Sequence, residues 1–324
     1  MKNIFKIAGI VIVILLVGLG SFAAYLKFGY PKVGEAPQIN IHSTPQLVER
    51  GEYLALYVAA CLDCHSTRDW NYFSGPLKPG TEGKGGEEFL SKDGDFFARN
   101  ITPAGIGNWT DGEIYRAITC GVSKNGAPIL PVMPYANYGK MDLEDVKAII
   151  AYLRTLKPIK NTVPPSVPDF FKNLILRTIP KPSQPQECPP KSDQLAYGKY
   201  IFTIAACDGC HTPQEKGKAL IGMELAGGVA FPLPEGGTVH SANISPDKET
   251  GIGSLTKEDF IRKFKYYSAP EQAKAPVQKG SYNTVMPWTM FAHMTEEDLG
   301  ALYTYLQSVP PVKNEVEQFT TNNN

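Results

Sequence analysis

The 324-residue sequence has no excess of charge of either sign, because 32 Lys and Arg residues balance 32 Asp and Glu residues. A chain without net charge lacks the broad basic surface that binds nucleic acid or an anionic membrane non-specifically. Cysteine is also scarce, and six residues in a chain of this length do not make the disulfide framework of a small secreted domain. The composition therefore excludes a general nucleic-acid binder and a disulfide-stapled scaffold.

Hydrophobic residues make up 43% of the chain, which supports packed cores and excludes a disordered protein. About 290 residues follow the N-terminal segment, and at roughly 150 residues per domain this length suggests two domains. The 30 Gly and 27 Pro residues predict much ordered loop between the regular elements.

The chain begins with an apolar run over residues 7–26, which is long enough to cross a hydrocarbon core as a helix. Lys2 and Lys6 precede the run, so the positive-inside rule places the N-terminus in the cytoplasm and the body of the protein outside. Small residues within 21–23 leave a cleaved signal peptide open as the alternative. Residues 1–30 are expected to be a membrane anchor or an uncleaved signal, and both the anchor and the signal-peptide interpretations export the body; a buried core helix is the third alternative.

Two copies of the pattern C-x-x-C-H occur, at Cys61–His65 and Cys207–His211. This spacing is typical of c-type haem attachment, in which two thiols add to the haem vinyl groups and the histidine ligates the iron. A redox dithiol would need a thioredoxin-like context, and zinc would need a fourth ligand nearby, and the sequence offers neither. We therefore expect two c-type haems, bound by Cys61, Cys64, His65, Cys207, Cys210 and His211.

The chain is an internal repeat with an offset of about 146 residues. Residues 100–103 (Asn-Ile-Thr-Pro) match residues 243–246 (Asn-Ile-Ser-Pro), and residues 133–135 (Met-Pro-Tyr) match residues 286–288 (Met-Pro-Trp). Each copy therefore carries one attachment motif and one set of accessory signals.

The sequence of each copy predicts a mainly helical structure. In the first copy, Thr44 and Pro45 predict a helix start, and apolar residues recur at helical spacing from there to Cys61. Gly51 and its equivalent Gly198 lie on this apolar face, where a glycine lets a second helix approach closely. The expected partners are the last helices of the two copies, at residues 143–156 and 296–308.

The last helices also carry start signals of their own. Asp142 and Thr295 are the expected N-caps, and acidic residues follow each of them in the first turn. Pro158 and Pro310 are expected to end these helices.

Methionine supplies the candidate sixth ligands of the haem irons. Met133 and Met286 occupy equivalent positions, each followed by a proline that stiffens the loop and by an aromatic residue. His/Met ligation raises the reduction potential relative to two histidines, and a closed iron suits a haem that only transfers electrons. Met141 and Met294 form another equivalent pair, which we interpret as packing residues, with ligation by one of them as the alternative.

A few residues of interest have no equivalent in the other copy. Cys120 and Cys188 belong to neither motif, and in an oxidising compartment they would either pair with each other or stay as separate thiols. Arg99 is a candidate donor to a haem propionate, whereas the second copy has Ala242 at that position. Such a difference would give the two haems unequal electrostatic surroundings.

Nine prolines within residues 158–190 mark a linker between the copies, and its apolar run 170–177 predicts a short helix packed on a haem domain. The tail after residue 313 is polar and is expected to fray. The predicted segments are an anchor at 1–30, a first haem domain at 43–157, a packed Pro-rich linker at 158–190, a second haem domain at 191–313 and a frayed tail at 314–324.

These motifs resemble those of class I cytochrome c domains. The fuller pattern is similar to the cytochrome c subunits of membrane-bound alcohol and gluconate dehydrogenases, over roughly residues 45–312. The resemblance implies an all-α fold with two tandem class I cytochrome c domains after an N-terminal transmembrane helix. Those subunits typically hold three haem domains, whereas this chain has two C-x-x-C-H motifs.

The expected function is electron transfer by a membrane-anchored dihaem cytochrome c between partners of a respiratory chain or a dehydrogenase, not catalysis, with a place as a subunit of an oxidoreductase complex left open. The expected partners are redox proteins, namely a dehydrogenase, a quinol-oxidising complex or a terminal oxidase, and no nucleic acid. The protein is expected to be a single-pass inner-membrane protein with its haem domains on the periplasmic side. The alternative functions are a haem enzyme such as a dihaem cytochrome c peroxidase, which needs an open iron and a distal acid/base pair, and a redox sensor.

Overall fold

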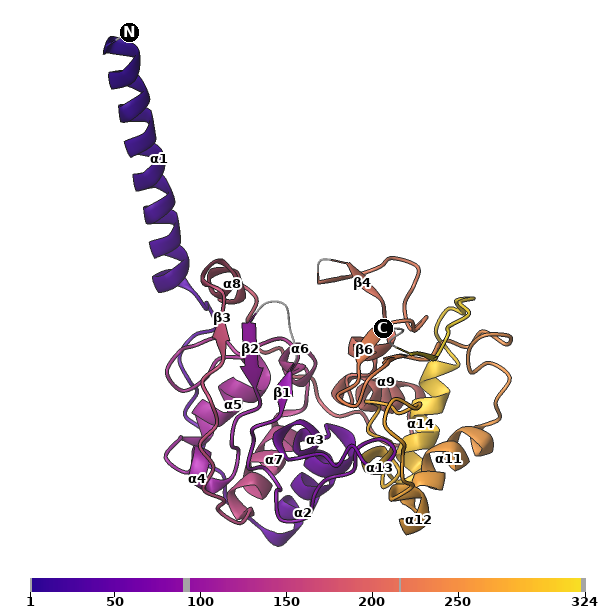
Figure 1. Ribbon diagram of the computed structural model, residues 1–324. Helices are drawn as coiled ribbons and strands as arrows, with labels where there is room; N and C mark the ends of the chain where they lie inside the picture. Colours follow the sequence, from indigo (N-terminus) through magenta and orange to yellow (C-terminus); the bar gives the residue numbers. More distant parts are fainter. Residues whose placement is uncertain (1, 90–93, 216, 322–324) are drawn as a thin grey trace.

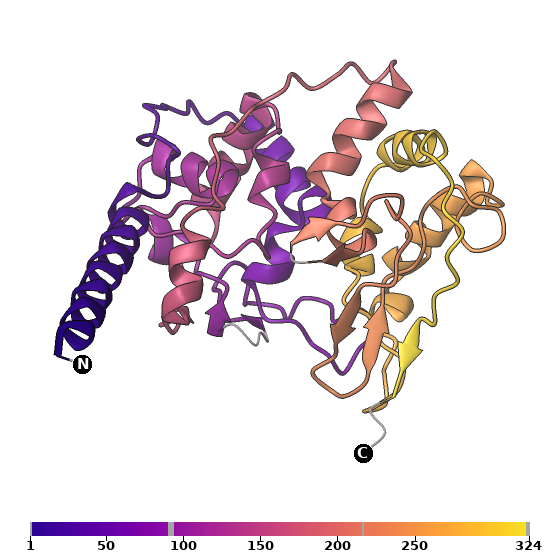
Figure 2. The ribbon, with the colours of Figure 1, turned by 90° about the horizontal axis from the view of Figure 1, so that it is seen from above.

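The computed structural model describes residues 2–89, 94–215 and 217–321 (Figures 1 and 2). One long helix, α1 (Lys2–Gly29), projects from a body of two lobes that lie side by side. We call residues 31–190 the first lobe and residues 191–321 the second lobe.

Helix α1 contains the predicted apolar run. Its most apolar 18-residue window has a mean hydropathy of 2.7 and is fully exposed. Membrane-spanning helices and signal sequences share this length and composition. The chain therefore has one N-terminal helix suited to either role.

Each lobe is built around a pair of crossed helices. In the first lobe, α2 (Pro45–Tyr53) packs on α7 (Leu143–Thr155), and in the second, α9 (Gln194–Ile204) packs on α14 (Glu296–Leu306). A Cβ atom on Gly51 would lie 1.8 Å from a backbone oxygen of α7, and one on Gly198 would lie 2.0 Å from a backbone oxygen of α14. The predicted glycine-mediated helix contact is confirmed in both copies.

The predicted helix starts are also confirmed. Thr44 caps α2, because its side-chain oxygen accepts a hydrogen bond from the Leu47 N–H at 3.2 Å. Asp142 caps α7 in the same way, because its carboxylate accepts the Glu144 N–H at 2.8 Å. Thr295 caps α14 by accepting a backbone N–H at 3.1 Å. These side chains satisfy donors that the first turn of a helix leaves without a partner.

Two further helices occupy equivalent places in the lobes. They are α5 (Asp111–Cys120) and α11 (Lys257–Lys265), and each starts with a reciprocal capping box, at Thr110 and Thr256. The shorter helical segments are η1 (Leu54–Val58), α3 (Cys61–His65), α4 (Pro103–Ile106), α6 (Tyr135–Tyr138), α8 (Phe170–Leu176), α10 (Cys207–His211), η2 (Tyr266–Ser268), α12 (Pro270–Ala273) and α13 (Trp288–Phe291).

The expected all-α fold is not confirmed, because the described residues also form three small antiparallel sheets. They are β1 (Glu88–Phe89), β2 (Gly94–Phe97) and β3 (Val167–Pro168); β4 (Gln214–Glu215) and β5 (Lys218–Ala219); and β6 (Ala230–Pro232), β7 (Thr238–His240) and β8 (Phe319–Thr320). Glycine-rich turns explain part of this difference. Gly236 and Gly237 have positive φ values and turn the chain between β6 and β7, so that the two flanking segments satisfy each other's backbone groups.

The expected frayed tail is wrong for residues 314–321, while residues 322–324 lie outside the described residues. Strand β8 pairs with β7, with Phe319 opposite Val239. The Phe319 ring also packs edge-on against Tyr282, with 5.9 Å between ring centroids. Strand pairing, the Phe319 ring and the hydrogen bonds of Asn314 to Thr250 and Ala226 O together hold the tail on the second lobe.

The Pro-rich linker follows the surface of the first lobe. Gln184 N–H donates to Gly139 O at 2.8 Å, and Cys188 N–H donates to the Asp142 carboxylate at 2.9 Å. Helix α8 forms within the predicted run 170–177 but contacts the foot of α1, and all of its residues stay at least partly exposed. The linker is therefore packed, although its helix lies beside α1 and not on a lobe core.

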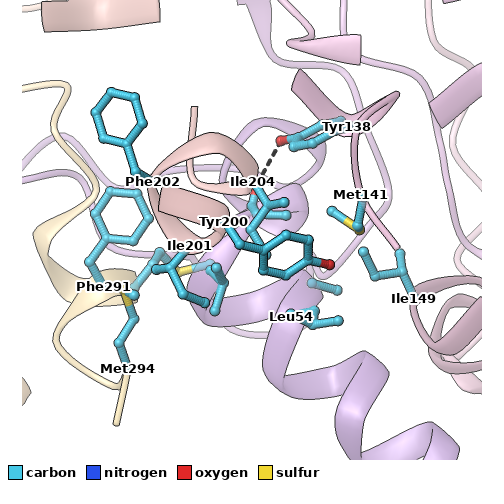
Figure 3. Close-up of a cluster of buried hydrophobic side chains, with 14 of the residues drawn as sticks. Leu54, Tyr138, Met141, Ile149, Tyr200, Ile201, Phe202, Ile204, Phe291 and Met294 are labelled. Carbon is cyan, nitrogen blue, oxygen red and sulfur yellow. Dashed lines mark hydrogen bonds between the residues drawn. The ribbon is translucent and has the colours of Figure 1, made fainter. Parts of the chain in front are cut away.

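The two lobes share one continuous apolar core (Figure 3). Tyr138 and Ile149 from the first lobe lie close to Tyr200 and Ile204 from the second. Met141 and Met294 are also fully buried in this cluster, at 1% exposure each. The lobes therefore form a single packed body at their interface.

Candidate haem sites

Both C-x-x-C-H motifs form a single helical turn that the chain enters through a strained residue. Ala60 precedes α3 with φ 46°, and Ala206 precedes α10 with φ 52°. Residues other than glycine are uncommon in this left-handed region, and their strain must be balanced by the surrounding structure. The same strained entry at both motifs indicates a geometry that both sites require.

The two motif histidines are oriented in the same way. His65 Nδ1 lies 2.7 Å from Arg99 O, and His211 Nδ1 lies 2.7 Å from Ala242 O. Because a carbonyl oxygen only accepts, Nδ1 carries the proton and Nε2 keeps its lone pair for a metal. Burial lowers the pKa of both imidazoles, which favours the neutral form that ligates iron.

The sequence did not reveal this role of positions 99 and 242. Their backbone carbonyls orient the histidines. Because every residue type has a backbone carbonyl, the presence of arginine at one position and alanine at the other does not indicate this role. The Arg99 guanidinium instead donates to Pro164 O in the linker at 3.1 Å. The predicted propionate contact therefore competes with a hydrogen bond within the protein.

All six cysteines lie in the described part of the chain and are unpaired. Burial raises the pKa of the Cys61 and Cys64 thiols to about 12 and also raises that of Cys207. The motif thiols are therefore protonated and are not consumed by disulfide formation. Cys120 and Cys188 are separate thiols in this structure, which corresponds to the second of the two alternatives for them.

Met133 and Met286 lie in loops of the same shape. Each precedes a proline that starts a short helix, with φ −80° at both prolines. The backbone N–H two residues later donates to the methionine carbonyl at 2.8 Å in both loops. Both side chains are half-buried, whereas Met141 and Met294 are in the core, as expected for packing residues.

Three buried side-chain polar atoms lack a partner among the described residues: Arg116 Nε, Tyr135 Oη and His240 Nδ1. Tyr135 follows the Met133 loop, and burial raises its pKa to about 12, so it stays a neutral donor. Buried donors without an acceptor are costly, and a bound group that carries carboxylates, such as a haem, could satisfy Arg116 Nε and Tyr135 Oη of the first lobe. The first lobe is thus suited to a group that carries acceptors.

The zinc alternative finds no support in the described ranges 2–89, 94–215 and 217–321. Within them, no group of three or more His, Cys, Asp and Glu side chains is placed to hold a metal ion. Two thiols and one imidazole with a free Nε2 instead match the donor set of covalent haem attachment.

The acidic residue within each motif has a specific partner. Asp63 is buried and pairs with the equally buried Arg68 at 3.2 Å. Burial raises the pKa of Asp63, while the Arg68 charge lowers it. Asp208 accepts a hydrogen bond at 2.8 Å from Asn137, which belongs to the other lobe.

The two motifs lie close together across the lobe interface. Besides Asp208, Asn137 also contacts Thr203 O at 3.1 Å, at the end of the helix that leads to the second motif. Burial raises the pKa of the Cys64 thiol, and the neighbouring Asp63 carboxylate raises it further. The structure thus brings together two sites that are distant in sequence.

Equivalent tyrosines join the lobes reciprocally. Tyr53 of the first lobe donates to Asp298 of the second at 2.5 Å, and Tyr200 of the second donates to Asp145 of the first at 2.6 Å. Each tyrosine oxygen also accepts the backbone N–H of a helix N-cap, at 3.0 Å and 3.2 Å. We call these four residues the tyrosine clasp.

Residues 195–310 match the family model of cytochrome c. The chain is 28% identical to the cytochrome c subunit of the quinone alcohol dehydrogenase of Gluconacetobacter polyoxogenes, over 82% of this chain and 56% of that protein. It is 29% identical to the gluconate 2-dehydrogenase cytochrome c subunit of Pantoea cypripedii, over 81% and 59%. It is also 28% identical to a diheme cytochrome c-type protein of Cereibacter sphaeroides, over 82% and 86%.

The resemblance that the motifs indicated is therefore confirmed, and the family model of cytochrome c matches most of the second lobe. The chain spans about half the length of the dehydrogenase subunits that it matches. Their names describe cytochrome c subunits, which agrees with electron transfer and not with a catalytic subunit.

Proposed function

We propose that this chain is a membrane-anchored electron-transfer protein with two covalently bound c-type haems, one in each lobe. The observation that carries the proposal is the duplicated motif geometry. Both motifs combine a strained entry, two free thiols and a histidine whose Nδ1 is fixed on a carbonyl at 2.7 Å. Two tandem class I cytochrome c domains, at 43–157 and 191–313, account for this repetition.

Each site would be formed by residues of one motif and one loop. Cys61, Cys64, Cys207 and Cys210 would attach the haems, and His65 and His211 would be the proximal ligands, with Met133 and Met286 as sixth ligands. A bound haem supplies one-electron chemistry between Fe(II) and Fe(III). The protein's part is to hold both axial ligands in both oxidation states, and the shared loop shape at the two methionines supports this role.

The foot of α1 supports a position at a membrane surface. Arg177 donates to Tyr30 O at 3.0 Å and so ties the linker to the end of α1. Beside it, α8 exposes large apolar side chains, with Phe170 at 67%, Phe171 at 76% and Ile175 at 59% exposure. Such side chains next to a membrane span are suited to the headgroup region, with the lobes on the periplasmic side.

We infer that the electron donor is a dehydrogenase subunit, because the relatives are named as cytochrome subunits of dehydrogenases. The near-neutral chain predicts docking through local charged patches with modest salt dependence. The acceptor would be a further component of a respiratory chain.

The test is a haem count and a visible spectrum of the purified reduced protein, before and after adding carbon monoxide. Two covalent haems and an unchanged spectrum are the expected result, because protein ligands close both irons. A carbon monoxide shift at one haem would contradict the ligation by two methionines and would favour a haem enzyme.

A further inference from the structure

A loop of the first lobe reaches the second lobe close to Met286. This cross-lobe loop, residues 68–77, runs beside residues 275–288. Phe73 N–H donates to Ala275 O at 2.8 Å, and Val277 N–H donates to Asn71 O at 2.9 Å. The contact is made by the backbone in both directions, so the position of the loop relative to the second lobe is well defined.

Ser74, in this loop, holds the segment that contains Met286. Its hydroxyl donates to Met286 O at 2.6 Å and accepts Trp288 N–H at 3.0 Å. Its backbone N–H donates to the side chain of the buried Asn283 at 2.9 Å. Ser74 is fully buried and therefore joins both ends of the Met-Pro-Trp segment without exchange with solvent.

The conformation of Ser74 is itself maintained by the first haem motif. Ser74 has φ 62°, a region that non-glycine residues rarely adopt. Buried Arg68 donates to Ser74 O at 2.7 Å and to Gly75 O at 3.0 Å, and it pairs with Asp63 of the first motif. One ion pair, between Asp63 and Arg68, and the hydrogen bonds of Arg68 and Ser74 thus connect the first attachment motif to the carbonyl of Met286.

The Met133 loop has no such support among the hydrogen bonds of the described residues. The bonds within residues 121–135 join partners of the first lobe, such as Ile129 N–H to Gly121 O at 2.8 Å and Met133 N–H to Leu130 O at 3.1 Å. Contact with the second lobe is made by Asn137 in the following helix, whereas Ser74 binds the Met286 segment itself, so the direct support of a methionine segment by the other lobe is an asymmetric feature of the repeat.

We propose that Ser74 is a positioning residue for Met286, through which the first lobe sets the coordination of the second haem. This inference rests on the proposed ligation of the second haem by Met286. A loop held at both ends keeps the thioether at the iron, because a free loop would gain conformational entropy on dissociation. Without the hydroxyl, an external ligand competes more successfully for the ferric iron.

The experiment uses the full-length protein with both haems and titrates the ferric form with imidazole. In Ser74→Ala we expect imidazole to bind the second haem about tenfold more tightly, which corresponds to about 1.4 kcal/mol in the Met286–iron equilibrium. The reduction potential of that haem should fall, because the thioether favours Fe(II), and that of the first haem should not change.

Two controls separate positioning from general loosening. Ser74→Gly removes the same hydroxyl but relieves the backbone strain, so it should show the same imidazole effect even where the alanine variant folds poorly. Tyr53→Phe removes a hydrogen bond between the lobes that does not touch the Met286 loop, and should leave imidazole binding unchanged. Wild-type binding in Ser74→Gly, or an equal change in Tyr53→Phe, would overturn the proposal.

A third variant distinguishes this inference from the function on which it rests. Met286→Ala should open the second haem to imidazole completely. If it does not, the ligand assignment is wrong. If Met286→Ala opens the haem but neither Ser74 variant has any effect, the ligation stands and the positioning role of Ser74 is refuted.

Discussion

The two tyrosines of the clasp should contribute unequally to the free energy of unfolding. When one tyrosine is replaced, the carboxylate that it bound keeps its other partners, and these differ between Asp145 and Asp298. Without Tyr200, Asp145 keeps two hydrogen bonds from Arg50, both at 2.9 Å. Without Tyr53, Asp298 keeps Tyr197 at 2.9 Å and a lysine no closer than 3.8 Å. Hydrogen bonds to charged groups contribute about 1.5–3 kcal/mol, and a buried carboxylate that loses a partner costs more.

We therefore expect Tyr200→Phe to lower the free energy of unfolding by about 1.5 kcal/mol and Tyr53→Phe by about 3 kcal/mol. The assay is denaturant unfolding of the full chain with both haems, followed by haem absorbance at neutral pH. Equal losses from the two variants would refute the argument from remaining partners. Losses below about 0.5 kcal/mol would show that water replaces the clasp without cost.

The clasp also predicts an alkaline dependence. Burial and the nearby Asp298 and Asp145 raise the pKa of Tyr53 and Tyr200 well above the usual value near 10. Above pH 10 the unfolded chain loses these protons while the folded protein keeps them, so stability falls as the pH rises. Each tyrosine contributes a slope of about 1.4 kcal/mol per pH unit, and the double phenylalanine variant should lose about twice that slope.

Three further predictions test the sites and the fold. Met133→His should lower the reduction potential of one haem and leave the other unchanged; unchanged potentials for both haems in a redox titration would reject Met133 as a ligand. Replacing both Cys207 and Cys210 by alanine should abolish covalent attachment at the second motif, because either thiol alone can still form one thioether bond, so that extraction of non-covalent haem leaves one haem per chain; two retained haems would contradict the motif assignment. Gly198→Ala should destabilise the second lobe by about 3 kcal/mol in thermal unfolding, because its Cβ would lie 2.0 Å from Ala301 O, whereas Gly209→Ala meets open space and should differ little from wild type.

Local signals predicted the parts of the fold that short-range physics determines. The caps at Thr44, Asp142 and Thr295 satisfy backbone donors within one turn, so residue type and spacing are sufficient to find them. Gly51 and Gly198 could be predicted as helix contacts, because a glycine on an apolar helix face lets a second helix approach closely. The C-x-x-C-H motifs carry their own donor set in five consecutive residues.

The rest depends on contacts that residue identity does not encode. The histidine partners at positions 99 and 242 are backbone carbonyls, which every residue has. Ser74 has no neighbouring signal, because its partners at Met286 and Trp288 lie more than 200 residues away. The pairing of β8 with β7 likewise joins a polar tail to a distant hairpin, so composition alone predicted fraying.

If each lobe binds one haem, as we propose, the distribution of these contacts between the two copies would give the two haems different surroundings. The clasp is duplicated, with Tyr53 and Tyr200 at equivalent positions, and it holds the two lobes together. The contacts of Asn137 and Ser74 occur once, and both run from the first lobe to the second site. The contacts present in both copies keep the two sites close to each other. The contacts present in only one copy would make the surroundings of the two irons unequal. An electron relay requires both properties, because transfer needs short separation and direction needs a difference in potential. The asymmetry should therefore appear as two distinct reduction potentials in the wild-type protein, and loss of the Ser74 hydroxyl should change the second of them alone.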